Sequence, residues 1–299
     1  MSDESRCGYV AIIGRPNVGK STLLNYLVGQ KVSITARKPQ TTRNRILGIH
    51  TYGHVQAVYV DTPGVHSDAK KALNKQLNRT ALRTIPDVDV ILFMVEGTKI
   101  TGDDEWILHK LKGVSVPVLL VVNKVDRLDD KSILLPHIEK LMEQMHFAEV
   151  IPLAALTGDN VSSLDACVAK YLPEGVHLFP EDQVTDKSDR FFVAEVIREK
   201  LIRHLGQEVP HAIAISLEKY AEENNILHIS AVIWVEREGQ KKIVIGKQGE
   251  MLKKIGTLAR QELEDQFNIK IFLQLWVKVK RGWSDDERAI ETLGFKEDK

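Results

Sequence analysis

The sequence has little cysteine, no long apolar run and no net charge. Its two cysteines, Cys7 and Cys167, match no zinc or redox spacing among 299 residues. We therefore expect unpaired thiols in a reducing compartment, which excludes a disulfide scaffold. No apolar run approaches the ~18 residues that cross a bilayer, and the first ten residues, MSDESRCGYV, lack the basic and apolar parts of a secretory signal. These absences predict a soluble cytoplasmic protein, at most peripheral on the cytoplasmic face of the cell membrane.

Acidic and basic side chains balance at 41 each. A chain without net charge has no global field that would hold it on a nucleic acid or an anionic membrane, so any basic surface must be local. The length of 299 residues allows two ordinary domains, each with its own core.

Residues 1–172 predict an α/β domain. Short apolar runs without polar alternation are typical of parallel strands covered on both faces, and they occupy residues 8–13, 55–61, 88–97, 117–126 and 150–155. Helical patterns lie between them, for example over 132–145 and 161–172. We therefore predict a mostly parallel sheet with helices on both faces.

Residues 173–190 carry two prolines, a glycine and many polar residues without sustained periodicity, which indicates a linker. The remainder, 191–299, predicts an α+β domain. Helical patterns cover 191–204 and 249–265, and strand-like runs cover 212–220, 226–236, 241–246 and 269–280.

Directly after the first strand, residues 14–21 read GRPNVGKS and satisfy the phosphate-loop pattern G-x-x-x-x-G-K-[ST]. Glycines let backbone N–H groups surround a phosphate at a helix N-terminus. Lys20 would place its charge on the β- and γ-phosphates, and the Ser21 hydroxyl would ligate Mg²⁺. The loop predicts a nucleoside triphosphate site.

Two further motifs follow strands and decide the base. Asp61-Thr62-Pro63-Gly64 places a carboxylate where it can hold a water of Mg²⁺, and the Gly64 N–H where it can meet a γ-phosphate. Asn123-Lys124-Val125-Asp126 supplies a carboxylate, Asp126, that matches the donors of guanine and not those of adenine. The set predicts GTP over ATP and disfavours a small-molecule kinase.

With these motifs and its C-terminal half, the chain resembles the Era-like GTPases, ribosome-assembly GTPases that carry a C-terminal type II KH domain. The resemblance implies that Thr42 is the switch I ligand of Mg²⁺, with Thr41 as the competing choice. It also implies that 154–156 form the guanine-base loop, in which the Ala155 N–H faces the guanine oxygen. The implied GTP and GDP site comprises Gly14, Arg15, Pro16, Asn17, Val18, Gly19, Lys20, Ser21, Thr22, Asp61, Thr62, Pro63, Gly64, Asn123, Lys124, Asp126, Ala154, Ala155 and Leu156, with Mg²⁺ held by Ser21, Thr42 and, through water, Asp61.

The hydrolytic apparatus is incomplete, because Val65 stands where Ras-like GTPases carry a glutamine that orients the attacking water. We therefore expect a slow GTPase whose catalytic groups are Lys20, Thr42 and Gly64. Asn17 is a candidate ligand of a monovalent cation, because its counterpart in related GTPases holds such a cation, usually K⁺, near the β- and γ-phosphates. The alternative is that Asn17 only stabilises the tight turn of the loop.

The C-terminal half concentrates positive charge. Residues 237–281 carry eleven Lys or Arg against five Asp or Glu. Within them, Val244-Ile245-Gly246-Lys247-Gln248-Gly249 resembles the GXXG loop of a KH domain, which clamps about four nucleotides of single-stranded RNA. The expected RNA contacts are Ile245, Gly246, Lys247, Gln248, Gly249, Lys253, Lys254, Lys278, Lys280 and Arg281. We expect an aliphatic groove from Ile243, Ile245 and Ile255, and packing roles for Trp276 and Trp283.

The resemblance implies a monomer that binds the 3′ end of 16S ribosomal RNA and acts in assembly of the 30S subunit. A different class of function stays open at this point: a membrane-associated signalling GTPase whose KH-like domain docks lipid or protein, since a basic segment also suits anionic lipid.

Overall fold

The structure, a computed structural model, describes residues 5–36, 38, 41–65, 72–205 and 213–283. The chain divides into two compact units whose main boundary lies between Asp186 and Lys187; the short segments Ala36–Thr41 and Lys71–Leu73 are grouped with the second unit. Some predicted positions lie outside the described residues. They are residue 212, the first residue of the strand predicted over 212–220, and the ends of the two predicted domains, residues 1–4 and 284–299.

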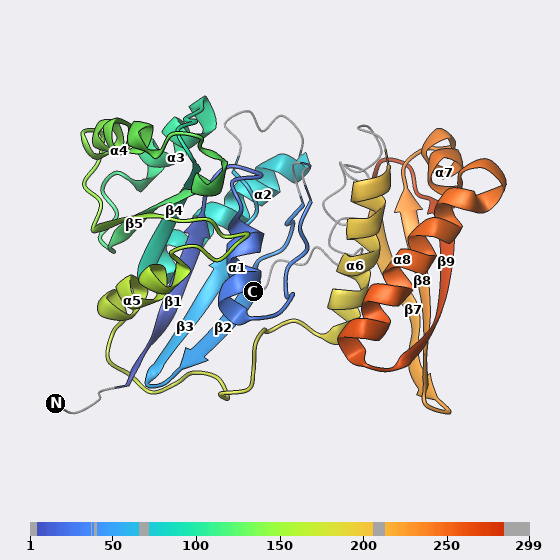
Figure 1. Cartoon of the computed structure of the whole chain (residues 1–299). Coiled ribbons are helices and arrows are strands. Elements are labelled where there is room, and N and C mark those ends of the chain that lie inside the picture. Colours follow the sequence, from blue (N-terminus) through green and yellow to red (C-terminus); the bar gives the residue numbers. More distant parts are fainter. Residues whose placement is uncertain (1–4, 37, 39–40, 66–71, 206–212, 284–299) are drawn as a thin grey trace. The chain divides into compact units, whose positions relative to one another are not determined.

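The first unit is built on a six-stranded sheet in the order β2-β3-β1-β4-β5-β6 (Figure 1). All neighbours pair in parallel except β2 and β3, which are antiparallel. The strands are β1 Arg6–Ile13, β2 Ile46–Tyr52, β3 Val55–Asp61, β4 Val90–Glu96, β5 Val118–Asn123 and β6 Glu149–Pro152. The predicted mostly parallel α/β sheet is confirmed.

Only β2 went unpredicted among these strands. It forms a hairpin with β3 across Gly53, whose φ of +54° suits a glycine in a tight turn. The apolar stretch on each side of Gly53 and His54 was the sequence signal for this hairpin.

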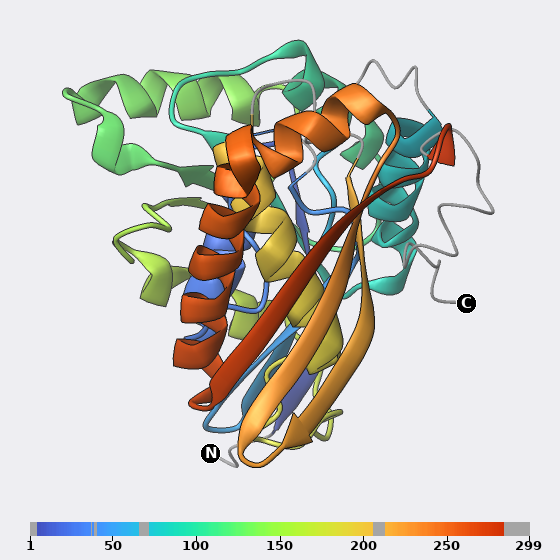
Figure 2. The same ribbon diagram turned by 90° about the vertical axis from the view of Figure 1, so that its right-hand side faces the viewer.

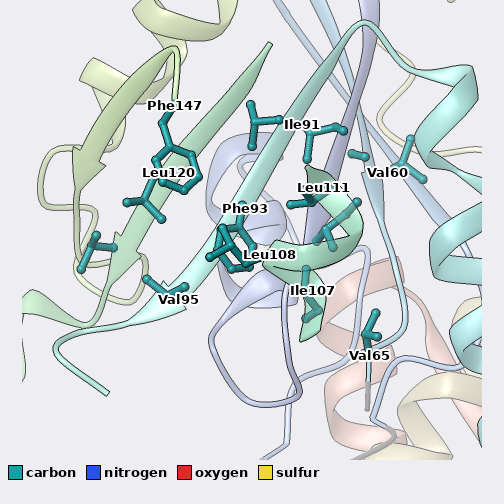
Figure 3. Packing of buried hydrophobic residues seen from close by; sticks show 14 of the residues in the cluster. Val60, Val65, Ile91, Phe93, Val95, Ile107, Leu108, Leu111, Leu120 and Phe147 are labelled. Carbon is teal, nitrogen blue, oxygen red and sulfur yellow. The ribbon is translucent and has the colours of Figure 1, made fainter. Parts of the chain in front are cut away.

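Helices cover both faces of the sheet (Figure 1). They are α1 Lys20–Val28, α2 Ala72–Arg83, α3 Gly102–Leu111, α4 Leu134–Met142 and α5 Val161–Tyr171. Under α3 and α4 the core packs tightly, and the rings of Phe93 and Phe147 stack with centroids 6.4 Å apart (Figure 3). No helix of the described residues is both long and apolar enough to cross a membrane.

The segment predicted as a linker is largely fixed to this first unit. Val184 accepts a hydrogen bond from the Ile49 N–H, and the Leu47 N–H donates to Asp186 Oδ1 at 3.0 Å. Gln56, which has no exposed surface, accepts from the N–H groups of Leu178 and Phe179 and donates to the Phe179 carbonyl. Residues 178–186 therefore form a strap that covers the free edge of β2.

The second unit has a three-stranded sheet in the order β7-β8-β9, antiparallel between β7 and β8 and parallel between β8 and β9. Its elements are α6 Asp189–His204, β7 Ala214–Glu223, β8 Ile226–Val235, α7 Glu238–Ile245, α8 Glu250–Phe267 and β9 Lys270–Val279. Helix α6 begins inside the predicted linker because the Ser188 hydroxyl caps it.

The prediction of a strand at 241–246 was wrong, because these residues belong to α7. The side chain of Gln240 accepts from the Glu236 and Arg237 N–H groups and so fixes the start of the helix. Val244 is buried in the core that α7 shares with α8 and the sheet. Helix capping and burial outweigh the preference of three consecutive β-branched residues for a strand.

Candidate nucleotide site and RNA-binding surface

The phosphate loop joins β1 to α1 through glycines that allow close backbone approach. A Cβ on Gly14 would lie 2.5 Å from the Met94 carbonyl oxygen. Gly19 has a φ of +114° and immediately precedes the first helical residue, Lys20. The unpaired N–H groups of the first turn of α1 are thus directed at the position of a phosphate.

Lys20 holds its ammonium group inside this loop. Its side chain is buried, and Nζ donates to the carbonyls of Gly14 at 2.9 Å and Arg15 at 3.0 Å. Burial lowers the pKa of Lys20 to about 8, although the Asp61 carboxylate opposes this shift. An anionic phosphate beside Lys20 would favour the protonated form.

Three predicted metal ligands meet at the end of β3. Ser21 Oγ donates to Asp61 Oδ2 at 2.7 Å and lies 2.9 Å from Thr42 Oγ1, which lies 3.3 Å from the same carboxylate oxygen. Burial raises the pKa of Asp61, while Lys20 and the hydroxyl donors oppose this change. Asp61 Oδ1 is buried and has no partner among the described residues. This set of hard oxygen donors fits Mg²⁺.

The switch I threonines lie in different surroundings. Thr42 is buried beside Ser21 and Asp61, whereas Thr41 Oγ1 donates to the Lys38 carbonyl at 2.6 Å. The neighbouring Gln40 of the motif lies outside the described residues. The geometry therefore favours Thr42 as the ligand.

Sequence reasoning missed Ser33 at this cluster. Its hydroxyl is buried and donates to Asp61 Oδ2 at 2.9 Å. Ser33 lies in a loop without a motif, so the sequence carried no signal for it.

The remaining residues of the phosphate-binding motifs support the loop. A Cβ on Gly64 would lie 2.6 Å from Pro16 Cγ, so only glycine fits there. Thr62 donates to the Ile12 carbonyl at 2.8 Å, and Val18 is fully buried. Pro63 is buried and Thr22 is partly buried.

Val65 faces the apolar core (Figure 3), fully buried in the cluster that contains Ile107 and Leu108. Its side chain therefore cannot orient a water at the phosphates. Residues 66–71, which follow it, lie outside the described residues.

The base-recognition residues also come together. Asn123 Nδ2 donates to the Val18 carbonyl at 2.7 Å, so this side chain joins the base motif to the phosphate loop. Lys124 Nζ donates to the Asn17 carbonyl at 2.6 Å. Asp126 is exposed, which leaves its carboxylate available to a base. Asn17 is exposed with a φ of +65°, which suits asparagine in a tight turn.

The backbone N–H of Ala155, expected to face the guanine oxygen, has a different partner in the structure. It donates to Asn123 Oδ1 at 2.9 Å, because the buried carboxamide oxygen needs a donor. The bond holds the base loop against the Asn123 motif and occupies the N–H expected to face guanine. Ala154 is buried in the same loop, and the Leu156 side chain that follows is 72 % exposed.

A charged network that sequence reasoning missed connects the two motifs. Arg15 donates to Glu96 at 3.1 Å and to Asp104 at 2.9 Å, and Glu96 also pairs with Lys124 at 3.1 Å. Although burial opposes it, the charges and hydrogen bonds of Lys124 and Arg15 lower the pKa of Glu96. The position of Glu96 at the end of β4, on the same sheet edge as Asp61 and Asn123, was the available signal.

Comparison with known proteins agrees with this geometry. Residues 9–124 match the family model described as 50S ribosome-binding GTPase, and residues 208–284 match the KH domain model. The chain is 55 % identical to GTPase Era of Marinobacter nauticus, covering 98 % of this chain and 96 % of that protein. It is 57 % identical to GTPase Era of Pseudomonas aeruginosa (strain LESB58), covering 97 % and 95 %.

The chain belongs to the Era family of GTPases. It is therefore an enzyme that hydrolyses GTP. A crystal structure of Era in complex with MgGDPNP and nucleotides 1506–1542 of 16S ribosomal RNA matches with a TM-score of 0.94 at 40 % identity, covering 98 % of this chain and all of that one. A single-residue variant of Aquifex aeolicus Era bound to GDP and AlF4⁻ matches with the same TM-score and coverage, at 39 % identity.

In this Era-family GTPase the GXXG loop connects two helices. Gly246 ends α7 with a φ of +75°, and a Cβ there would lie 2.6 Å from Met251 Cβ. Gln248 and Gly249 also have positive φ, and this tight turn leads into α8. Lys247, Gln248, Lys253 and Lys254 are all exposed around the start of that helix. The loop thus combines close backbone approach with a helix N-terminus and free cations.

Of the three isoleucines expected to line an aliphatic groove, one lies in the core instead. Ile243 is 50 % exposed and Ile245 is partly buried, so both can line a surface, but Ile255 is fully buried in the domain core. Trp283 packs as predicted, with no exposed surface. The packing role for Trp276 was wrong, because its side chain is 56 % exposed on β9.

The other predicted RNA contacts lie along or after β9. Lys278 pairs with Glu218 at 2.8 Å, Lys280 is partly exposed and Arg281 is exposed. The structure does not bring Lys278 to the GXXG loop: it places this side chain on the sheet, beside the Trp234 ring.

Proposed function

We propose that this Era-family GTPase is a nucleotide-controlled switch that binds the single-stranded 3′ end of 16S ribosomal RNA and acts in 30S subunit assembly in the cytoplasm. One observation carries the proposal: a single chain joins a guanine-nucleotide site to a GXXG loop between two helices. The small subunit is favoured because a structure that matches 98 % of the chain contains 16S ribosomal RNA, whereas the model described as 50S ribosome-binding matches residues 9–124 alone.

Mg²⁺ and the nucleotide would use the oxygen cluster at β3. The hydroxyls of Ser21 and Thr42 would hold the ion, with Asp61 acting through a water, and the ion would offset the charge of the β- and γ-phosphates. Lys20 adds a point charge there, and the Gly64 N–H meets the γ-phosphate. Asp126 accepts from the donor edge of guanine.

Hydrolysis would be slow because Val65 is buried and this position offers no group to orient water. We propose that Asn17 helps to hold K⁺ near the phosphates, since its side chain is exposed at the phosphate loop. A loss of the K⁺ dependence of hydrolysis in Asn17→Asp would support this role, and full retention would contradict it.

Nucleotide state would reach the KH domain through β2. This strand begins four residues after Thr42, and its Leu47 is hydrogen-bonded to both Thr185 and Asp186, the last residues before the second unit. Ordering of Thr42 by Mg²⁺ and the γ-phosphate would therefore act on a strand tied to the start of the KH domain.

RNA binding can be tested by fluorescence anisotropy with a labelled single-stranded copy of the 16S 3′ end, a scrambled RNA of equal composition, and anionic lipid vesicles. The proposed function predicts tight binding of the first RNA by the protein, taken as a monomer, with a GTP analogue. The double variant Lys247→Asp, Gln248→Asp should lose it, because both side chains are exposed and the glycine conformations are kept. Equal binding of both RNAs, or binding of vesicles alone, would contradict the proposal.

A further inference from the structure

The KH sheet has a second face that no described helix covers. Along β9 the side chains of Ile271, Leu273, Leu275, Val277 and Val279 face the core shared with α6, α7 and α8. The alternate residues Phe272, Gln274, Trp276 and Lys278 therefore point to the opposite side. Figure 2 shows this sheet in front of α6.

Aromatic side chains stand exposed on that face. Phe272 is 50 % exposed and Trp276 is 56 % exposed, whereas Ile271 beside them is 5 % exposed. The register of β8 places His228 next to Phe272 and Val232 next to Trp276, and the His228 and Phe272 rings lie 5.4 Å apart. A group of exposed aromatic residues is informative where a single exposed apolar residue is not.

Basic residues flank these rings in the sequence, and this stretch contains no acidic residue. Lys270 precedes the rings, Lys278, Lys280 and Arg281 follow them, and no Asp or Glu occurs from 266 to 284. Glu218 of β7 pairs with Lys278, but both side chains are about half exposed. An exposed ion pair contributes little, so a phosphate can replace the carboxylate.

Exposed aromatic rings between cations are the arrangement with which proteins bind single-stranded nucleic acid, because bases stack on the rings and phosphates contact the cations. Interface cores of protein complexes are also rich in aromatic residues but are depleted of lysine, so the three flanking lysines favour nucleic acid over a protein partner. The strand also packs against α7, the helix that leads to the GXXG loop. β9 is one of the two edge strands of the sheet, and on its inner side Val277 and Val279 pack against the core that contains Val244 of α7.

We propose that Phe272 and Trp276, with His228 and the flanking cations, form a second single-stranded RNA surface on the open face of the KH sheet. This inference rests on the proposed RNA-binding function and extends it: the GXXG loop grips about four nucleotides, and the open face stacks bases beyond them. Phe272 and Trp276 are four residue steps apart along β9, which separates the two rings by about 13 Å, so they contact bases that are not adjacent.

The test compares two RNAs from the 16S 3′ end, one of four nucleotides and one of twelve, on full-length protein with a GTP analogue. Trp276→Ala and Phe272→Ala should each weaken binding of the longer RNA about tenfold and leave the shorter RNA unchanged. Trp276→Tyr should restore binding, because a tyrosine ring also stacks. Leu135→Ala, which removes an equally exposed apolar side chain on α4, should change neither affinity.

Unchanged affinity for the longer RNA in both alanine variants would overturn the inference. This holds also if the two variants no longer bind a protein partner, because the face would then be a protein-docking surface. An equal loss for both RNAs would also overturn it, because that result places the effect in the groove or in the fold. Failure of the unmodified protein to bind either RNA would instead overturn the proposed function. Quenching of tryptophan fluorescence by the longer RNA, absent in Trp276→Ala, gives a second readout.

Discussion

Gly19 and the side chain of Asn123 lie so close that a Cβ on Gly19 would stand 2.2 Å from Asn123 Nδ2. That same amide donates to the Val18 carbonyl. The phosphate loop and the guanine motif thus meet at one atom. A change in either motif should therefore alter binding of both the phosphates and the base.

Gly19→Ala should therefore weaken GDP binding at least tenfold. The new methyl group displaces Asn123, and φ of +114° is unfavourable for alanine. The matched control is Gly29→Ala, which has a positive φ but open space around it, so it carries backbone strain alone. Titration with a fluorescent GDP analogue measures both. Equal losses of affinity in the two variants would contradict a specific contact between the motifs.

Thr42→Ala should reduce Mg²⁺-dependent affinity for a GTP analogue and lower the hydrolysis rate about tenfold or more, with less effect on GDP. Its hydroxyl lies within the Ser21 and Asp61 cluster. Thr41→Ala serves as the control, because its hydroxyl bonds only main-chain carbonyls of its own loop in the described structure. A larger effect from Thr41→Ala in nucleotide titrations would reverse the assignment.

The lowered pKa of Lys20, about 8, predicts proton uptake on nucleotide binding. At pH 8 about half of the free protein has a neutral Lys20, and a bound phosphate favours the ammonium, so GDP binding should take up about half a proton. Affinity should accordingly fall as pH rises above 8. The stability of the nucleotide-free protein should change with pH in the opposite direction. Between pH 8 and 10.5 the folded state binds fewer protons at Lys20 than the unfolded state does. The free-energy penalty for burying Lys20 therefore becomes smaller as pH rises through this range.

Calorimetry in buffers of different ionisation enthalpy, with EDTA present to exclude metal-linked protons, measures the uptake. Lys20→Arg is the control, because a guanidinium stays protonated over this range. Zero uptake at pH 8 in the unmodified protein would refute the account of Lys20.

Gln56→Ala should destabilise the first unit by about 2 to 4 kcal/mol, since it removes a buried side chain that satisfies several strap backbone groups. The strap, residues 178–186, should then be cleaved faster by proteases. Gln183→Ala removes a single contact, to the Thr185 carbonyl, and should cost under about 1 kcal/mol. Thermal unfolding and limited proteolysis give the comparison, and equal behaviour of the two variants would count against an anchored strap.

The motifs that follow buried strands were predictable because their chemistry is tied to local spacing. Asp61 and Asn123 end strands β3 and β5, and parallel strands bring such ends to one edge. Ser33 was not predictable, because it reaches Asp61 by a tertiary contact from a loop without a motif. The pairing of Glu96 with Arg15 is also a tertiary contact, although the place of Glu96 at the end of β4 indicated that it lies on this edge of the sheet.

The same limit explains one of the errors in the second unit. The apolar run at 241–246 reads as a strand from propensity alone, and only its capping and its packing against α8 make it a helix. Trp276 shares its face of β9 with Gln274 and Lys278, while the alternate residues are aliphatic, so the alternation indicated an outward position for its ring. The packing role expected from its large apolar side chain is therefore wrong for a reason that the sequence contains.

Nucleotide state should control RNA binding by this GTPase, and one measurement tests this coupling most directly. Anisotropy of a labelled 3′-end 16S RNA is recorded with the protein loaded with Mg²⁺ and a GTP analogue, and again with GDP. We predict binding at least tenfold tighter with the GTP analogue, and loss of that difference in Thr42→Ala. Equal affinity in both nucleotide states would show that the KH domain binds RNA independently of the GTPase, which would contradict the switch.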